Sequence, residues 1–328
     1  MTAPSHDEAR PRTLLERWRG TRKGFKPTDV EEPIDYHWHR PLAGLLVEAL
    51  RDTAVTPNQV TIASGVASIL AGLLMGLAGF YGRWLIVPGG LMLLVSIVLD
   101  CADGQLARIR GTASPVGRIL DGLVDILAPV SVMHGLAFYL VQQGHGYGTV
   151  WPLGWLAALS LLWHAGAYDV QKNVYLHATT PSFSIGGATL VTLEDIRGYE
   201  AEYRARGELF YAFLMKVFHS WTLPQLGIIE PWLAPERRID NEAERDAFRA
   251  IFRPRMAAMT WLGFGTHLFL LTLAAWLAPL GSWSIWIAWA LMFGPMNLVC
   301  AWILVTQRRA ERAFEERLRE LRKASAAA

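Results

Sequence analysis

Long apolar segments almost free of charged residues run through this chain and restrict its possible folds more than any other feature. We read six of them, and each approaches the ~20 residues that a helix needs to cross a bilayer. They cover residues 60–80, 84–99, 119–141, 150–168, 256–280 and 282–306. The sequence therefore predicts an all-α polytopic membrane protein with six transmembrane helices.

Basic residues predict how these helices are oriented. Arg83 is the only Lys or Arg in the short connections after the first, third and fifth segments. The N-terminus, the 108–118 connection, the stretch after residue 168 and the C-terminus are rich in Lys and Arg. Because basic connections tend to stay in the cytoplasm, we expect both termini to face it, across a bacterial inner (cytoplasmic) membrane.

Composition excludes several other classes of protein. The net charge is only +2, which gives no reason to expect a nucleic-acid partner. Two cysteines, Cys101 and Cys300, cannot form a disulfide framework, and no Cys or His spacing typical of a metal site is present. The first residues carry charges of both signs, so they do not resemble a cleavable signal peptide.

The N-terminal part of the chain divides into three regions. Residues 1–32 form a polar, basic segment that we expect to be loosely ordered. In residues 33–59, apolar residues at helical spacing predict an N-terminal amphipathic interfacial helix, followed by the turn into the first span. Thr56 and Pro57 predict the start of that span, as a capping residue and a first-turn proline. Residues 60–171 then hold spans one to four.

The C-terminal part contains one long polar region. Residues 172–255 form a cytoplasmic insertion between the fourth and fifth spans, and residues 209–221 within it could lie as a helix in the membrane interface. Residues 256–306 hold spans five and six. Residues 307–328 alternate basic and acidic side chains, as expected of a charged, solvated helix.

Four carboxylates lie at the inner edges of the second and third segments. They are Asp100, Asp103, Asp121 and Asp125. If both segments are helical here, two acids lie on one face of each helix, beside the small residues Ala107 and Gly117. A charge at membrane depth costs at least ~2.5 kcal/mol, so four together need compensation. Hard divalent cations such as Mg²⁺ or Mn²⁺ prefer oxygen ligands, so this cluster predicts a metal-dependent enzyme acting on phosphate esters.

Two other interpretations of the acids are open. They could form an ion-pair network with Arg108, Arg110 and Arg118. They could also belong to a cation transporter, since transporters keep acids within their spans. The acids gather at one end of the helices and do not extend through the bilayer, which disfavours transport.

The acidic stretch resembles the signature of the CDP-alcohol phosphotransferase (CDP-alcohol phosphatidyltransferase) family, Asp-x2-Asp-Gly-x2-Ala-Arg-x8-Gly-x3-Asp-x3-Asp. The fixed positions are filled by Asp100, Asp103, Gly104, Ala107, Arg108, Gly117, Asp121 and Asp125. The segment Thr-Pro-Asn-Gln-Val-Thr before the first span is also similar to the family pattern, with Asn58 and Thr61 at its polar positions.

The resemblance implies a phospholipid-synthesis enzyme that transfers a substituted phosphoryl group from a CDP-linked donor to an alcohol and releases CMP. Asp100, Asp103 and Asp121 would bind two divalent ions, and Asp125 would be both a ligand and the general base. The donor nucleotide would lie against Asn58, Thr61, Gly104, Ala107, Arg108 and Gly117. A homodimer is also expected from the family.

Two branches of this chemistry remain open. In the favoured branch, CDP-diacylglycerol, a membrane lipid, donates to a small water-soluble alcohol or alcohol phosphate. In the other, CDP-choline or CDP-ethanolamine delivers its headgroup to a lipid hydroxyl.

Several polar residues outside the signature could contact the acceptor or a phosphate. They are Arg110, Arg118, His164, Tyr168 and Lys172. The last three lie with Tyr175 on one face of the fourth segment, where we favour anchoring at the membrane interface over contact with the acceptor. The two arginines could equally be positive-inside anchors. His134 is expected to pack in the core, and Asn297 to hydrogen-bond between helices.

Overall fold

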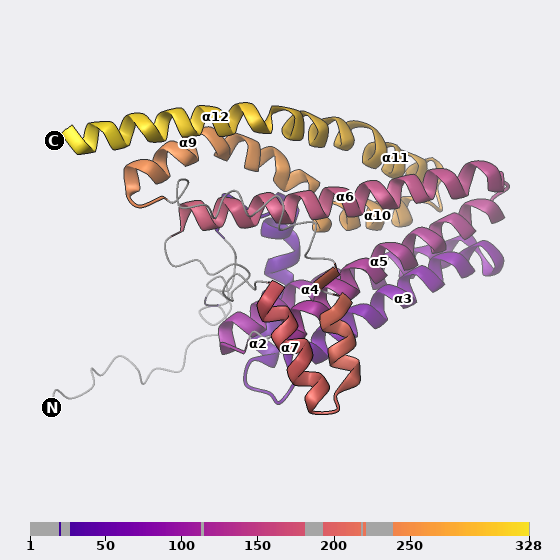
Figure 1. The fold of residues 1–328 in the computed structure, drawn as a ribbon. Coiled ribbons are helices and arrows are strands. Elements are labelled where there is room, and N and C mark those ends of the chain that lie inside the picture. The colour runs from indigo at the N-terminus through magenta and orange to yellow at the C-terminus, as the bar shows by residue number, and fades with distance from the viewer. Residues whose placement is uncertain are drawn as a thin grey trace.

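The computed structural model describes residue 20 and residues 27–112, 115–180, 193–217, 219–220 and 239–327. Every regular element in these residues is a helix, as the apolar segments predicted. The helices form a bundle in which α3, α5 and α6 run side by side, with α12 along its outer edge (Figure 1).

The first unit of the bundle consists of α3 (Pro57–Tyr81), α4 (Ile86–Arg110) and α5 (Pro115–Gln142). α3 begins as predicted: Pro57 is its first residue, and Thr56 and Gln59 form a capping box. Backbones of α3 and α5 approach closely at Gly72, where an added Cβ would lie 2.2 Å from the carbonyl oxygen of Ser131. At Gly76 of the same helix, the nearest atom to an added Cβ would be 3.7 Å away, so of these two glycines only Gly72 lies where a side chain would overlap the neighbouring backbone.

The second unit packs against the first through a shared apolar core. Its helices are α6 (Tyr147–Thr179), α9 (Glu242–Met259), α10 (Phe264–Leu277), α11 (Trp283–Leu291) and α12 (Asn297–Ala327). The 3₁₀ turn Thr260–Leu262 and the extended Gly263 break the helix between α9 and α10. α6 continues to Thr179 and α9 begins at Glu242, so helices extend from both sides into the predicted insertion.

Five segments of the described chain are long and apolar enough to cross a membrane. They are Pro57–Tyr81, Arg83–Arg110, Ile119–Gln142, Glu242–Leu277 and Trp283–Ala326. α6 has 33 residues but is not among these five, since Trp, His, Gly and Tyr side chains dilute its apolar ones. The predicted count of six therefore depends on α6, which packs inside the bundle and contributes to its core.

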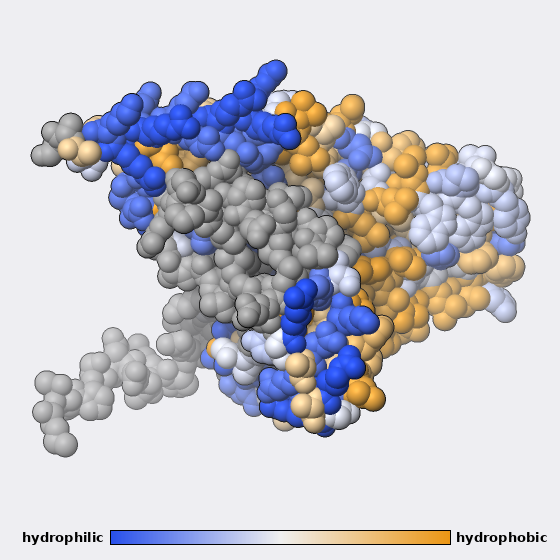
Figure 2. Space-filling model, in the orientation of Figure 1, coloured by the Kyte–Doolittle hydropathy of each residue, from blue (hydrophilic) through white to orange (hydrophobic). Residues whose placement is uncertain are grey.

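The surface polarity of the molecule divides along the bundle. Hydrophobic residues cover much of the bundle surface, and hydrophilic ones gather over α9, the C-terminal part of α12 and α7 (Figure 2). α7 spans Leu193–Ala205 and lies in the predicted insertion. This division is typical of an integral membrane protein whose polar parts emerge together on one side.

Residues 27–39 form an ordered strap against the second unit. Tyr168 donates to the carbonyl oxygen of Val30 (2.6 Å), and Tyr175 donates to Asp29 (3.0 Å). The Glu32 carboxylate accepts from the backbone N–H of Thr266 (2.9 Å) and so caps α10. The expectation of loose order for residues 1–32 is wrong for residues 29–32. The sequence could not show this, because their hydrogen-bond partners lie more than 130 positions away.

The predicted amphipathic helix is α2 (Arg40–Leu50). Ala43 and Val47 pack on α4, whereas Leu42 and Leu45 are exposed. One apolar face of α2 therefore packs on the protein, and the apolar residues Leu42 and Leu45 remain available to contact lipid.

Candidate metal centre

α4 and α5 bring three aspartates together. α4 remains helical through its acids to Arg110, so Asp100 and Asp103 face the start of α5. One carboxylate oxygen from each of Asp100, Asp103 and Asp121 lies within 4.8 Å of the other two. Asp103 is buried, and the other two are half-buried. Two acidic helix faces therefore meet, as the spacing predicted.

This oxygen cluster has the dimensions that a divalent cation needs. Oxygens on opposite sides of one Mg²⁺ lie about 4.2 Å apart, and those around Ca²⁺ about 5 Å apart. The donors are all carboxylates, the ligands that hard cations prefer. The three aspartates could hold a metal ion, and the cation would offset like charges that burial makes costly.

Thr61 orients one of these carboxylates from the neighbouring helix. Its hydroxyl donates to Oδ2 of Asp103 at 2.5 Å, and both residues are buried. The sequence pattern had assigned Thr61 to the donor nucleotide, and no feature of the sequence paired it with a residue 42 positions away. Groups that hydrogen-bond a metal ligand hold it in the orientation that the cation requires.

The fourth acid and the signature arginine adjoin the cluster. Asp125 lies close enough to Asp100 to interact with it electrostatically. The Arg108 guanidinium lies over Gly104, where an added Cβ would be 3.2 Å from its nearest nitrogen. The other predicted nucleotide contacts, Asn58, Ala107 and Gly117, are half-buried.

Arg110 performs a structural role. Its guanidinium donates to backbone carbonyls of Arg51, Val55, Leu50 and Thr53 at distances of 2.5–3.2 Å. These bonds fasten the turn between α2 and α3 to the end of α4, so the guanidinium is already engaged and is not directed at a phosphate. The side chain of Arg118 lies outside the described residues.

The polar stripe of α6 faces the protein interior. His164 contacts His267 of α10 and Asn297 of α12, each at 3.1 Å. Tyr168 donates a hydrogen bond to Val30 of the strap, and Lys172 forms an ion pair with Asp169. Anchoring at the membrane interface is therefore the wrong interpretation of this stripe, because its side chains are buried.

Two expectations for other polar residues are confirmed. Asn297 also donates to Ser160 of α6 (2.8 Å), which makes it the expected interhelical partner. His134 packs its ring against Trp151 and Trp155 in the bundle.

The strap and the first residue of α2, Arg40, add charged residues that the sequence pattern did not associate with the site. Arg40 is buried beside Glu31 (2.7 Å) and interacts electrostatically with Arg108, while Asp35 interacts with Asp100. Burial opposes the charge of Arg40, but Glu31 and other anions outweigh it and hold its pKa above the usual value. The sequence did not predict that these residues lie near the aspartates, because more than 60 positions separate them from most of the signature.

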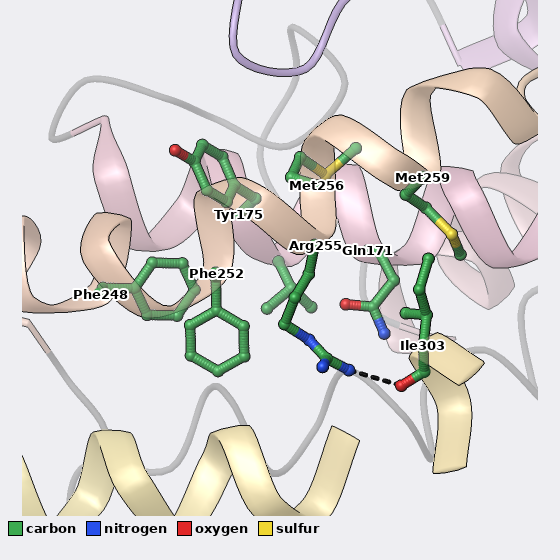
Figure 3. Close-up of a pocket in the computed structure, with 9 residues that line it drawn as sticks. Gln171, Tyr175, Phe248, Phe252, Arg255, Met256, Met259 and Ile303 are labelled. Carbon is green, nitrogen blue, oxygen red and sulfur yellow. Dashed lines mark hydrogen bonds between the residues drawn. The ribbon is translucent and has the colours of Figure 1, made fainter. Parts of the chain in front are cut away.

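A separate pocket lies between α6, α9 and α12 (Figure 3). It is lined mainly by apolar and aromatic side chains, and none of the four aspartates borders it. Its cation, Arg255, donates to the carbonyl oxygen of Ile303 and to the side chains of Thr306 and Gln307. We therefore interpret the pocket as part of the packing between α9 and α12.

The fold and the acidic cluster together define a membrane-embedded helical domain with a group of carboxylates that could hold a metal ion. The model of the CDP-alcohol phosphatidyltransferase family matches residues 54–198, which include all four aspartates. Members of the family are phosphotransferases.

Similar proteins support the same assignment. The chain is 36% identical over 115 residues to the bifunctional IPC transferase and DIPP synthase of Rubrobacter xylanophilus, covering 35% of this chain and 25% of that protein. It is 36% identical over 90 residues to the archaetidylinositol phosphate synthase of Pyrococcus horikoshii, covering 27% and 45%. It is 33% identical over 99 residues to the phosphatidylinositol phosphate synthase of Mycobacteroides abscessus, covering 30% and 41%. The alignments thus span less than half of each of these relatives.

Proposed function

We propose that this protein is an integral membrane CDP-alcohol phosphotransferase of phospholipid synthesis. It transfers a substituted phosphoryl group from a CDP-linked donor to an alcohol and releases CMP. The observation that carries the proposal is the convergence of Asp100, Asp103 and Asp121 within 4.8 Å in a region that matches the family.

Asp100, Asp103 and Asp121 would hold one or two divalent cations, Mg²⁺ or Mn²⁺, with help from Asp125. When bound, such cations neutralise charge at the phosphorus under attack and on the departing phosphate. Thr61 fixes Asp103 in its ligand orientation. Arg108 lies at the edge of the acids, where its guanidinium can bind phosphate oxygens through two hydrogen bonds.

Asp125 is the general base in this proposal. It takes the proton from the acceptor hydroxyl as that oxygen forms a bond to the donor phosphorus. The bond between this phosphorus and the CMP oxygen breaks, and CMP leaves as the anion.

The names of two relatives describe the synthesis of lipids with an inositol phosphate headgroup. We propose CDP-diacylglycerol as the donor and a phosphorylated polyol, such as an inositol phosphate, as the acceptor. We propose that both termini and the site face the cytoplasm, where such water-soluble acceptors are found. We also propose a homodimer, α6 as a sixth span, and acceptor contacts by His164, Tyr168 or Lys172.

The test is CMP release by the purified protein in lipid nanodiscs. CDP-diacylglycerol is supplied with pooled alcohols and alcohol phosphates, and CDP-choline with pooled diacylglycerols, each with Mg²⁺ or Mn²⁺. Mass spectrometry identifies the lipid product and so distinguishes the two branches. We expect a cation-dependent product in the first arm.

Asp125→Asn should abolish turnover and retain donor binding, because the amide keeps the shape of the side chain but cannot accept the proton. Asp52→Asn is the matched control, since Asp52 is an exposed acid paired with Arg51 at 3.7 Å. CMP release by neither arm would overturn the proposed function. Full activity of Asp125→Asn would remove only the assignment of the base.

A further inference from the structure

A helical hairpin lies in the long polar insertion. It consists of α7, a turn at residues 206–208, and a second helix over residues 209–217. Gly207 has a φ of +77°, a left-handed conformation that favours glycine. The N–H groups of Gly207 and Glu208 donate to the carbonyls of Arg204 and Tyr203, which is the Schellman arrangement that ends a helix and reverses the chain. We call residues 193–217 the α7 hairpin.

One face of the α7 hairpin is anchored at the start of α5. Ile196, Leu214 and Met215 are buried in one cluster with Ile119. Ile119 is the first residue of the third candidate span, and Asp121 follows two positions later. The hairpin therefore lies at the boundary between membrane and cytoplasm, beside the metal centre.

The opposite face of the second helix is apolar and exposed. Leu209, Phe210 and Phe213 are 66%, 64% and 60% exposed. Three large apolar side chains on one helix face are costly to leave in water. Lys216 is exposed on the same helix and can reach anionic headgroups.

The hairpin has the orientation and polarity of an element that lies on a bilayer. Figure 1 shows it crosswise to α3 and α5, and hence parallel to the plane of a membrane that those helices cross. The exposed side chains of α7 form ion pairs, Arg204 with Glu200 and Arg206 with Glu202, as expected of a face in water. Exposed apolar residues on the nearby start of α5, Ile126 and Leu127, continue towards the lipid.

We propose that the helix of residues 209–217 docks into the lipid surface and thereby holds the cytoplasmic start of α5. The occupant of its exposed apolar face is the headgroup–acyl boundary of the bilayer that surrounds the spans. Through Ile119, this docking fixes the first turns of α5, which carry Asp121 and Asp125. The docking itself does not depend on the proposed function; its effect on turnover does.

Docking is tested by site-directed spin labelling. The two native cysteines, Cys101 and Cys300, are buried, so a nitroxide attaches selectively to an introduced thiol. Labels are placed at Phe210→Cys and Phe213→Cys, with Glu202→Cys on α7 as the aqueous control. The protein is reconstituted in vesicles of phosphatidylethanolamine and phosphatidylglycerol, and collision rates with O₂ and with a water-soluble nickel chelate are measured.

We expect labels at positions 210 and 213 to collide preferentially with O₂, and the label at 202 with the nickel chelate. Equal access of the chelate at all three positions would overturn the proposal. Shielding of positions 210 and 213 from both reagents would also overturn it, because that result indicates a protein partner, such as a second copy, in place of lipid.

The link to the site is tested with the double variant Phe210→Ser/Phe213→Ser against Glu202→Ser. The first should lower kcat about tenfold, which corresponds to ~1.4 kcal/mol of lost positioning, with little change in the KM for donor. Mn²⁺ binding, measured as loss of the free-ion EPR signal, should weaken in the same variant and remain normal in Glu202→Ser. Unchanged kcat and Mn²⁺ binding in the double variant would refute the effect of docking on the site. If the native protein showed no activity, the proposed function would fail, but the Mn²⁺ binding and the spin labels would still test the docking and its effect on the aspartates.

Discussion

The hydrogen bond between Thr61 and Asp103 allows a quantitative test of the metal centre. Replacing Thr61 with Val keeps the shape of the side chain and removes the hydroxyl that donates to Oδ2 at 2.5 Å. A hydrogen bond to a charged group contributes about 1.5–3 kcal/mol. If this energy holds the carboxylate in its ligand orientation, cation binding should weaken about 10- to 100-fold, as when groups that support a metal ligand are removed.

The assay measures Mg²⁺ activation of CMP release and, independently, Mn²⁺ binding by EPR. Thr61→Val should shift both midpoints to higher cation concentration, while the KM for the CDP donor changes little at saturating cation. Thr61→Ser retains the hydroxyl and should behave like the native protein. A normal cation dependence with a raised KM for the donor in Thr61→Val would refute this reasoning. It would indicate instead that Thr61 contacts the donor nucleotide.

Three further perturbations test the fold around the site. Gly72→Ala should lower the free energy of unfolding by about 3 kcal/mol, the upper range of overpacking costs, because its Cβ would overlap a backbone oxygen of α5, which cannot move aside. Asn297→Leu should destabilise the protein by about 1–3 kcal/mol, since the Nε2 atom of the buried His164 loses its contact with the Asn297 side chain and keeps only His267 on its other nitrogen. Burial, assisted by Asp35, raises the pKa of Glu32 from 4.5 to about 8. The folded protein then binds this proton more tightly than the unfolded chain does, so stability should fall as pH rises from about 5 to 8, and Glu32→Gln should flatten the fall.

Thermal unfolding in detergent, followed by circular dichroism, measures all three effects. Gly76→Ala is the control for the glycine variant, because its Cβ would make only ordinary contacts at 3.7 Å. Equal melting temperatures for Gly72→Ala and Gly76→Ala would contradict the packing argument. For Glu32, a native protein whose stability rises over this pH range would contradict the raised pKa, and an unchanged melting temperature in Asn297→Leu would show that the His164 contact contributes little.

The sequence predicted features that depend on short-range spacing. The two acidic helix faces, the cap at Thr56 and the helical character of the spans all follow from residues within one or two turns of each other. The role of Thr61 could not be predicted, because its partner lies on another helix. The role of Arg110 could not be predicted for the same reason. A guanidinium can donate hydrogen bonds to phosphate oxygens or to carbonyl oxygens, and only the fold brings the carbonyls of the α2–α3 turn close to it.

The break in the fifth span was also hidden from the sequence. A run of apolar residues from Met256 onward reads as one helix, and only the tertiary contact with Glu32 reveals why the helix restarts after Gly263. The glycine leaves room for the Glu32 carboxylate, since an added Cβ would lie 2.0 Å from it.

The cap that Glu32 places on α10 has a practical consequence for producing this protein. Removal of residues 1–32 would leave the first amide groups of α10 without their acceptor, in an environment where water cannot replace it. Shortened versions intended for crystallisation or microscopy should therefore retain residue 27 onward, and purification tags belong ahead of that point or after the last turn of α12.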